Sequence, residues 1–312
     1  MNVHVLVDYS FLYYKYKFQL DSGRMRRLTC NMEWEGQVID KDISQVYYSL
    51  REIEGFRRDW ENKGHNVVVS VCFDMPSKRK IENTAVSEKY KSNRENKLGS
   101  DDFKNIQFAE KLLNQAGHNT YRVDGFEADD LITHIVKLYK DKFDATIIYT
   151  PDADLLVNIC GNVAAMRYKS GKQYTLVTLS NFTDYLSQEL KCYIPYNALT
   201  LYKCTVGDKS DCIDGIKGFG PAAFNKLVTI LTDTPNVNWS ISASPEKVTE
   251  LLSLSNKIGA INSGQLEQAM QALELVKPYE PDIGVVKEPT SQSTRELREI
   301  AYKPYQMMSL LD

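Results

Sequence analysis

Apolar residues recur along the chain in two patterns, which predict strands separated by helices. Residues 1–7, 66–74 and the first part of 144–156 are short apolar runs rich in β-branched residues, as is typical of buried strands. Residues 42–63 and the segment that begins near Phe126 repeat apolar positions at helical spacing. Strands that alternate with helices indicate an α/β fold, with a mainly parallel central sheet flanked by helices on both faces.

Other segments give weaker signals. Residues 9–18 are rich in aromatic side chains and are expected to form a helix or a turn, and residues 21–41 are expected to form a loop. Residues 163–178 favour a hairpin, after which helices follow. Ser293 and Glu296 form a capping-box pattern, which predicts the start of a short C-terminal helix.

Acidic residues gather where these predicted elements begin and end. Asp8 and Asp74 end two strands, and Asp152 and Asp154 follow a third. Because the carboxyl ends of parallel strands meet at one edge of a sheet, we expect these four side chains to lie close together. The other five candidate acids are Glu127, Asp129 and Asp130 in "GFEADDLI" and Asp208 and Asp211 in "VGDKSD".

Nine carboxylates at one site require cations. A helix N-terminus favours a single acid by roughly 0.3 to 1 kcal/mol, but buried like charges a few ångströms apart cost more than that. Ligand oxygens without His or Cys suit Mg²⁺ or Mn²⁺. Two such ions about 4 Å apart form the clamp used in phosphodiester hydrolysis. A nuclease, a phosphatase and a nucleotidyl transferase all remain open at this point.

The distribution of charge favours a nucleic-acid partner. The formal net charge is −3, and it becomes +6 when the nine candidate acids are set aside. Residues 78–97 hold seven Lys or Arg against three Glu. A charged run is usually a solvated face, but this one follows Asp74 directly, and that position favours phosphate binding. A nuclease is therefore the best of the three enzyme classes.

A glycine-rich stretch, "DGIKGFGPAAFNKL" at residues 214–227, offers a second phosphate-binding feature. Gly215, Gly218 and Gly220 lead into a helix that begins at Pro221. Glycines let a backbone approach a phosphate closely, and a helix N-terminus supplies amide donors. The same spacing also serves ordinary turns, so this signal is weak by itself.

Composition excludes several other classes of protein. Hydrophobic residues make up 43% of the chain and charged residues 25%, and no apolar run approaches the length of a membrane span. The six cysteines are scattered without a CxxC pair and there are only four histidines, so neither a disulfide framework nor a zinc site is indicated. We expect a cytoplasmic protein without a membrane partner.

Taken jointly, these motifs resemble those of the 5'-3' exonuclease and flap endonuclease family. The resemblance is to the free-standing enzymes of bacteriophages and to the 5' nuclease domain of bacterial DNA polymerase I, and it covers about residues 1–230. It implies a PIN-like 5' nuclease fold with a helical arch and a helix-three-turn-helix. The motifs occur in the family's order: "VLVDYS", "VCFDMPSK", "EKYKSNRE", "GFEADDLI", "TPDADLL" and "VGDKSDCIDGIKGFGP".

The resemblance also implies residue roles. It implies two Mg²⁺ ions, for which Mn²⁺ substitutes, with Asp130 acting on the first ion directly or through water. Around the first ion it places Asp8, Asp74, Glu127 and Asp129, and around the second Asp152, Asp154, Asp208 and Asp211. In the arch, Tyr90, Lys91 and Arg94 would contact DNA, with Lys91 and Arg94 stabilising charge at the scissile phosphate.

In the helix-three-turn-helix, the resemblance implies contacts to duplex phosphates and a K⁺ ion held by loop carbonyls. The residues expected to contact the duplex are Gly215, Gly218, Gly220, Lys217 and Lys226. The implied substrate is DNA with a 5' flap, fork, gap or nick, or an RNA–DNA primer end, in replication or repair. A phage-encoded enzyme of this kind would work in the host bacterial cytoplasm.

The expected domains are a catalytic α/β domain at 1–195, with the arch at about 76–105, a helical DNA-binding region at 196–276, and a linker and tail at 277–312. We expect a monomer, with a sliding clamp or a single-strand binding protein as possible partners. The tail "YQMMSLLD" loosely resembles clamp-docking peptides, although packing on its own domain is the favoured interpretation.

Two other functions stay open. A PIN-like single-strand ribonuclease would typically use about four acids and would lack the arch and the glycine-rich duplex grip. A catalytically inactive DNA-junction binding protein would have lost several carboxylates, and here all nine remain.

Overall fold

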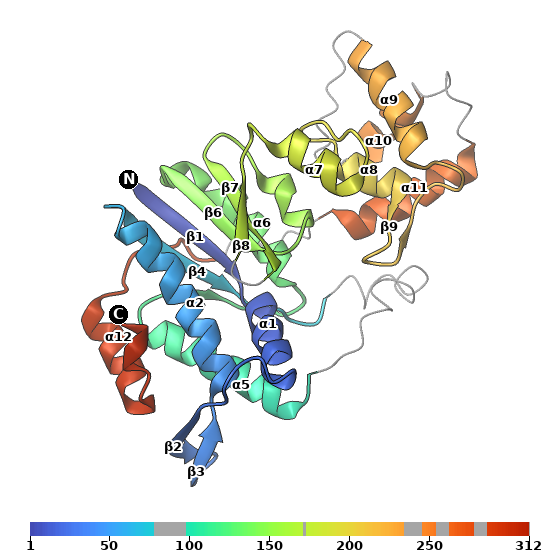
Figure 1. Ribbon diagram of the computed structural model, residues 1–312. Coiled ribbons are helices and arrows are strands. Elements are labelled where there is room, and N and C mark those ends of the chain that lie inside the picture. Colours follow the sequence, from blue (N-terminus) through green and yellow to red (C-terminus); the bar gives the residue numbers. More distant parts are fainter. Residues whose placement is uncertain (78–97, 171–172, 234–244, 254–261, 278–285, 312) are drawn as a thin grey trace.

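A six-stranded sheet forms the centre of the molecule (Figure 1). The computed structural model describes residues 1–77, 98–170, 173–233, 245–253, 262–277 and 286–311. The strand order is β5-β4-β1-β6-β7-β8, and every neighbouring pair is parallel except β7 with β8. The predicted α/β fold with a mainly parallel sheet is confirmed. The strands are β1 (Asn2–Asp8), β4 (Asn66–Cys72), β5 (Asn119–Tyr121), β6 (Ala145–Thr150), β7 (Val163–Ser170) and β8 (Gln173–Val177).

Strand β1 lies between β4 and β6 and is buried on both faces. Val3, Val5 and Val7 belong to one hydrophobic core, and Leu6 belongs to another on the opposite face. Successive side chains of a strand point to opposite faces, so a strand covered on both sides must be apolar at nearly every position. This explains why "VHVLV" reads as an uninterrupted run, except for His4, whose Nε2 lies 2.8 Å from the hydroxyl of Ser70.

Helices cover both faces of the sheet. On the face of Val3 and Val5 pack α1 (Tyr9–Asp21), α2 (Ser44–Glu61), α5 (Ser100–Gln115) and the C-terminal α12 (Arg295–Tyr302). On the face of Leu6 pack α6 (Ala128–Tyr139) and α7 (Phe182–Leu190). Short 3-10 helices are η1 (Lys140–Lys142), η2 (Asp154–Asn158), η4 (Lys303–Tyr305) and η5 (Met308–Leu310).

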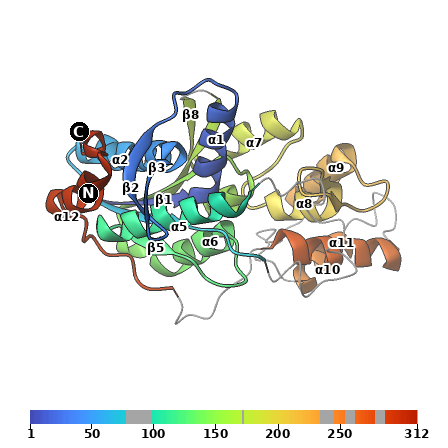
Figure 2. The same ribbon diagram turned by 90° about the horizontal axis from the view of Figure 1, so that it is seen from below.

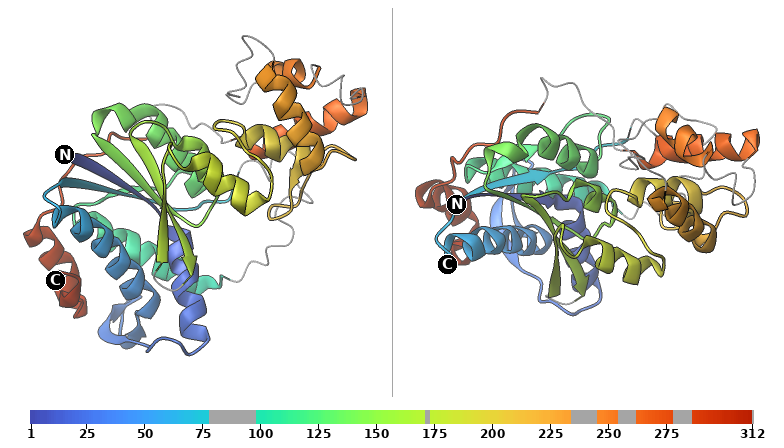
Figure 3. Two further views of the ribbon diagram at one scale, coloured as in Figure 1. Left: turned by 45° about the horizontal axis from the view of Figure 1, so that its top comes forward. Right: turned by 90° about the horizontal axis from the view of Figure 1, so that it is seen from above.

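A group of helices extends from one end of the sheet. It contains α8 (Leu199–Val206), α9 (Pro221–Asp233), α10 (Pro245–Ser253) and α11 (Ser263–Val276), with the two-residue strands β9 (Gly207–Asp208) and β10 (Ile213–Asp214) between α8 and α9. Figures 2 and 3 show this group at the opposite end of the molecule from α12 and the two chain termini. None of the helices in the described ranges combines the length and the apolarity that crossing a bilayer requires.

Two local predictions were wrong. Residues 21–41 are not only a loop, because β2 (Thr29–Trp34) and β3 (Gln37–Asp42) pair as an antiparallel hairpin. Glu35 and Gly36 turn the chain with φ values of 51° and 78°. Cys30 and Met32 of β2 are buried and alternate with exposed residues, but no residue of β3 is buried, so only one strand of the pair shows a hydrophobic pattern.

The cap of α12 is Thr294 rather than Ser293. The side chain of Thr294 accepts a hydrogen bond from Leu297 N at 3.2 Å. The hydroxyl of Ser293 instead accepts one from the guanidinium of Arg298 at 3.0 Å, so it does not cap the helix.

Candidate metal centre

Three of the predicted acids lie at the carboxyl edge of neighbouring strands. Asp8 is the last residue of β1, Asp74 follows β4 by two residues, and Asp152 follows β6 by two residues. Because the order of these strands is β4-β1-β6, their ends meet, and the three acids line one cavity of about 840 Å³. The family resemblance implied that Asp152 belongs to the second ion, whereas here it shares a cavity with Asp8.

The carboxyl of Asp8 is in a strongly unfavourable place for a negative charge. Burial raises its pKa well above the usual range, and the carboxylate of Asp74 raises it further. A hydrogen bond from Phe11 N, 3.3 Å from Asp8 Oδ1, opposes this rise without cancelling it. A cation beside Asp8 would restore the charged form. The strand edge therefore has the electrostatics of a cation site.

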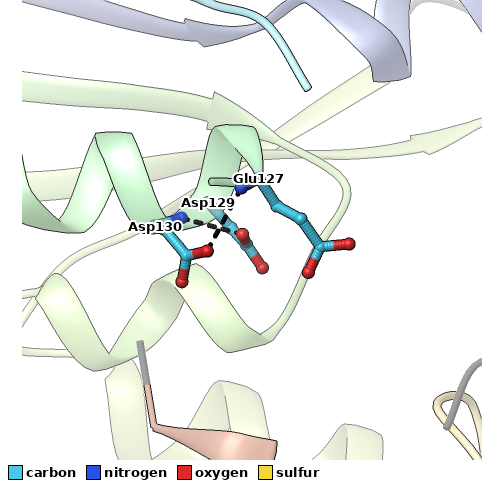
Figure 4. A group of neighbouring side chains, drawn as sticks. All are labelled: Glu127, Asp129 and Asp130. Carbon is cyan, nitrogen blue, oxygen red and sulfur yellow. Dashed lines mark hydrogen bonds between the residues drawn. The ribbon is translucent and has the colours of Figure 1, made fainter. Parts of the chain in front are cut away.

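The first turn of α6 adds three more acids. Carboxylate oxygens of Glu127, Asp129 and Asp130 lie within 4.8 Å of one another. Figure 4 shows the three side chains leaving this turn, with Glu127 N donating to Asp130 at 3.2 Å and Asp130 N donating to Asp129 at 2.8 Å. These backbone donors hold the acids against their mutual repulsion.

A second acidic group joins η2 to the start of the helical group. Carboxylate oxygens of Asp154, Asp208 and Asp211 lie within 4.8 Å of one another. Asp154 also lines a small cavity with Asp129 and Asp130, so the second group adjoins the first turn of α6. All nine predicted acids thus lie in these connected groups, which come from five separate segments of the chain.

Lys203 is a site residue that the sequence motifs did not reveal. Its ammonium donates to Asp208 Oδ2 at 2.6 Å and also pairs with Asp154, and the residue is only 7% exposed. Burial raises the pKa of Asp208, but Lys203 and the hydrogen bonds of Ser210 outweigh burial and lower it. The signal in the sequence was a single lysine among the apolar residues of "LTLYKCTV".

Arg167 on β7 is the second residue that was missed. Its guanidinium donates through Nε to the carbonyl of Pro151 at 3.2 Å and also pairs with Glu189 on α7. Pro151 directly precedes Asp152, whose N–H donates to Thr150 Oγ1 at 2.9 Å. The loop that carries two of the acids is therefore held by a buried cation.

The donor set fits hard divalent cations. Each of the two acidic groups offers at least three carboxylates, and neither contains His or Cys. Mg²⁺ and Mn²⁺ prefer oxygen ligands of this kind. Lys203 lies among the acids of the second group, as expected where a cluster of carboxylates attracts positive charge.

Close packing of the backbone explains part of the glycine content of the glycine-rich loop. A Cβ at Gly215 would lie 2.3 Å from the carbonyl carbon of Val206, so only glycine fits there. Gly218 has a positive φ of 82°, and a Cβ at Gly218 or Gly220 would meet nothing within 4 Å. The open space beside these two glycines is available to a ligand.

The two lysines of this region are exposed, but part of the loop is already engaged. The backbone N–H of Lys217 donates to Gln268 on α11 at 3.2 Å. Lys226 lies one turn into α9. The predicted contacts from Tyr90, Lys91 and Arg94 fall in residues 78–97, outside the described residues.

The aromatic run in α1 is divided between the core and the surface. Tyr9 and Tyr13 are fully buried, whereas Tyr14 is 41% and Phe18 64% exposed. Both exposed rings line the cavity of Asp8, together with Arg24, whose guanidinium lies 5.5 Å from the centre of the Phe18 ring. This cavity thus extends from the acids along an aromatic and basic helix face.

Sequence comparison decides the family. The model of the 5'-3' exonuclease N-terminal resolvase-like domain matches residues 4–185, more than half of the chain. The chain belongs to the 5'-3' exonuclease family. The matched segment contains seven of the nine acids, all except Asp208 and Asp211. The resemblance that the motifs indicated is confirmed, and with it the prediction of a nuclease enzyme.

Relatives carry the same family description. The chain is 27% identical to the 5'-3' exonuclease of Aquifex aeolicus over 214 residues, which cover 67% of this chain and 70% of that protein. It is 30% identical to the 5'-3' exonuclease of Mycoplasma genitalium over 155 residues, 49% of this chain and 51% of that one. A match to DNA polymerase I of Treponema pallidum, 30% over 132 residues, covers 42% of this chain and 12% of the polymerase.

Solved structures share the fold. The T5 D15 protein crystallised with metal ions has a TM-score of 0.55 at 15% identity, covering 100% of this chain and 96% of that one. The bacteriophage T5 D15 flap endonuclease in complex with DNA and metal ions has a TM-score of 0.53 at 16% identity, with 88% and 99% covered. The catalytic core of Rad2 with a DNA substrate has 0.52 at 13%, with 99% and 90% covered.

Proposed function

We propose that this chain is a divalent-metal-dependent, structure-specific 5' nuclease, a 5'-3' exonuclease and flap endonuclease. It would hydrolyse phosphodiester bonds near the junction of single- and double-stranded DNA or RNA-primed DNA, in replication or repair. One observation carries the proposal. Nine carboxylates from five segments meet at one end of the sheet, in a member of the 5'-3' exonuclease family.

The acids would hold two Mg²⁺ ions, which Mn²⁺ replaces. Asp8 and Asp74 at the strand edge, with Glu127 and Asp129, would hold one ion, and the group of Asp154 would hold the other. Such ions supply an activated water and stabilise the leaving oxygen. Asp130 lines a cavity with Asp154, and Asp152 lines the cavity of Asp8 and accepts a hydrogen bond from Asp154 N at 2.9 Å, so both are proposed to serve as shared ligands.

The protein residues would position these ligands and the substrate. Backbone donors at the start of α6 orient its three acids, and Arg167 holds the loop of Asp152. In the arch, Lys91 and Arg94 are proposed to contact the scissile phosphate and to stabilise developing negative charge. The exposed rings Tyr14 and Phe18 would contact bases next to the acids.

The helical group α8–α11 would hold the downstream duplex. Gly218, Gly220, Lys217 and Lys226 are exposed or lie beside open space on this group, which supports contacts to phosphates, with K⁺ at the loop. The T5 D15 flap endonuclease and the Rad2 core have been solved with DNA. We also propose the domain division at 195 and 276, which is supported by the extension of α8–α11 from the end of the sheet (Figure 1).

The remaining assignments concern the oligomeric state and the C-terminal tail. The chain is proposed to act as a monomer on flap, fork, gap and nick substrates. In the C-terminal tail, Met307 and Leu310 are fully buried in the core beside α2 and α12. Docking of this tail on a sliding clamp would therefore require its release from the core.

The test is cleavage of a labelled 5'-flap DNA. Asp152→Asn should abolish cleavage in Mg²⁺ while binding of the junction in Ca²⁺ survives, because the charge that holds the metal is lost but the DNA surface is not. Asp124→Asn is the matched control, since Asp124 is an exposed carboxylate close to α6 outside the acidic groups. Unchanged cleavage by Asp152→Asn would refute the metal assignment, and product lengths on flap, nick and gapped DNA would define the preferred substrate.

A further inference from the structure

A second cavity lies on the far side of α1 from the acids. It measures about 510 Å³, a size typical of small-molecule sites, and it opens between α1, α2 and β8. Its walls are unusually aromatic. The rings that line it are Tyr16, Tyr48, Phe56, Tyr149 and Tyr174.

The base of this cavity is a fixed polar network. The ammonium of Lys15 donates to both carboxylate oxygens of Glu52 at 2.7 Å, and the hydroxyls of Tyr16 and Tyr174 also donate to Glu52. Lys15 lies 4.3 Å from the centre of the Tyr168 ring. These contacts hold the tyrosine rings in place, so the cavity is built before any ligand arrives.

Gly55 supports the interpretation that this cavity has a function. It lies in the middle of α2 and lines the cavity, and a Cβ placed there would meet no atom within 4 Å. Glycine is less favourable than alanine inside a helix, and its backbone here does not need glycine because φ is in the ordinary helical range. The helix therefore carries a destabilising residue where a side chain would enter the cavity.

The lining indicates the class of ligand. Aromatic rings bind flat bases by stacking. Arg51, Arg58 and Asp59 also line the cavity, and since Arg58 donates to the carbonyl of Leu310, Arg51 is the cation that suits a phosphate. Lys15 and Gln19 line both this cavity and the cavity of Asp8, so the two are adjacent across α1. Nucleic acid bound at the acids would thus bring nucleotides close to this second cavity.

We propose that the cavity of Gly55 binds one nucleotide, with the base among the tyrosines and the phosphate at Arg51. The nucleotide is either an unpaired unit of the bound DNA or a free mononucleotide. For the DNA source, the inference rests on the proposed nuclease function. The base and phosphate chemistry is the same for both sources.

Two substitutions test the proposal without disturbing the acids. Gly55→Met fills the cavity with a side chain that favours helices, and Gly55→Ala is the matched control, which restores helix propensity but adds only a methyl group. Both should leave the melting temperature unchanged or higher. Arg51→Glu reverses the charge at the cavity and leaves the rings in place.

The first measurement is calorimetric binding of dAMP in EDTA. Gly55→Met and Arg51→Glu should each weaken dAMP binding roughly tenfold. Gly55→Ala and Asp152→Asn should bind it like the unaltered protein. Because no metal and no cleavage are involved, this result does not depend on the nuclease assay.

The second measurement uses DNA duplexes in Ca²⁺, with and without one unpaired 2-aminopurine nucleotide. Quenching of that base by the unaltered protein and Gly55→Ala, but not by Gly55→Met, identifies DNA as the source. Loss of dAMP binding without a change in quenching identifies a free mononucleotide. If Gly55→Met changes neither dAMP binding nor quenching, the proposal is overturned, whatever the outcome of the cleavage assay.

Discussion

The ammonium of Lys203 lies 2.6 Å from Asp208 Oδ2, inside the second acidic group. It also pairs with Asp154, so one buried cation neutralises part of a cluster of three carboxylates. A metal ion and a lysine would thus stabilise the same acids. The stability of this region should depend on both cations, and each should matter more when the other is missing.

Replacing Lys203 distinguishes the stabilisation by the lysine from the stabilisation by the metal ion. Lys203→Met keeps the volume and removes the charge, so without metal the protein should lose about 3 kcal/mol of unfolding free energy, as when one partner of a buried pair is removed. Adding Mg²⁺ should raise the melting temperature of both proteins, and by more in Lys203→Met. Thermal unfolding with EDTA and with Mg²⁺ measures the difference. Equal rises would show that lysine and metal do not stabilise the same carboxylates.

Asp74 is predicted to have two separable roles. Its Oδ1 accepts a hydrogen bond from Ala128 N at 2.7 Å, so it caps α6 as well as facing Asp8. Asp74→Asn retains an acceptor for this amide and Asp74→Ala does not. In EDTA, the alanine variant should be less stable than the asparagine variant by about 1 kcal/mol, the typical value of a cap. Both variants should lose cleavage, and equal stability in urea unfolding would contradict the capping role.

Glu54 anchors the C-terminal helix to α2. It is fully buried, and it accepts hydrogen bonds from Tyr302 on α12 at 2.7 Å and from Arg57 at 2.6 Å, with His118 Nε2 at 2.8 Å. Burial raises the pKa of Glu54, but His118, Arg57 and Tyr302 together outweigh burial and lower it to about 2. The network joins α2, the residue before β5 and α12, so its loss should loosen the tail.

The lowered pKa of Glu54 gives a pH dependence with a defined sign. The unfolded state binds the proton more tightly, so the stabilisation is complete above the usual pKa of 4.5 and is lost as pH falls toward 2. Glu54→Gln should reduce the unfolding free energy by about 3 kcal/mol at pH 7. This difference in unfolding free energy between the variant and the unaltered protein should become smaller between pH 4.5 and 2. Urea unfolding of both proteins across this pH range measures the difference in unfolding free energy. Glu61→Gln, at an exposed partner of Arg57, is the control, and a gap independent of pH would contradict the pKa shift.

The acidic positions could be predicted from the sequence because they follow general rules of folding. Asp8 and Asp74 come after apolar runs, and parallel strands bring their ends together whatever the details of packing. Glu127 and Asp129 begin a strongly amphipathic helix, whose buried face determines where its first turn lies.

The other site features depend on contacts between distant segments. Lys203 and Arg167 look like ordinary charges in a helix and a strand, and only tertiary packing places them against Asp208 and Pro151. The cavity of Gly55 is formed by residues of α1, α2, β6, β7 and β8, which are separated in sequence. The hairpin of β2 and β3 was missed because β3 has no buried residue, which leaves the alternating pattern of β2 without a recognisable partner strand.

Arg167 should act on the metal site through the backbone of the loop that carries Asp152. Its guanidinium donates to the carbonyl of Pro151 and pairs with Glu189 on α7, so it fixes where the loop leaves β6. Arg167→Met keeps much of the length of the buried side chain but has no donor for the carbonyl of Pro151. The loop should then shift, and the metal would be bound less tightly while the DNA surface stays intact.

The expected result for Arg167→Met is a higher Mg²⁺ concentration for half-maximal cleavage, by roughly tenfold, equivalent to 1.4 kcal/mol. KM for DNA should stay close to that of the unaltered protein at saturating Mg²⁺, because no predicted DNA contact is removed. Arg167→Lys, which retains one donor for Pro151, should fall between the two. Glu189→Gln removes only the charge that pairs with Arg167 and leaves the contact of Arg167 with Pro151, so it should change the Mg²⁺ requirement least. A variant that lost stability but needed no more Mg²⁺ would mean that Arg167 supports the fold and does not position the metal ligands.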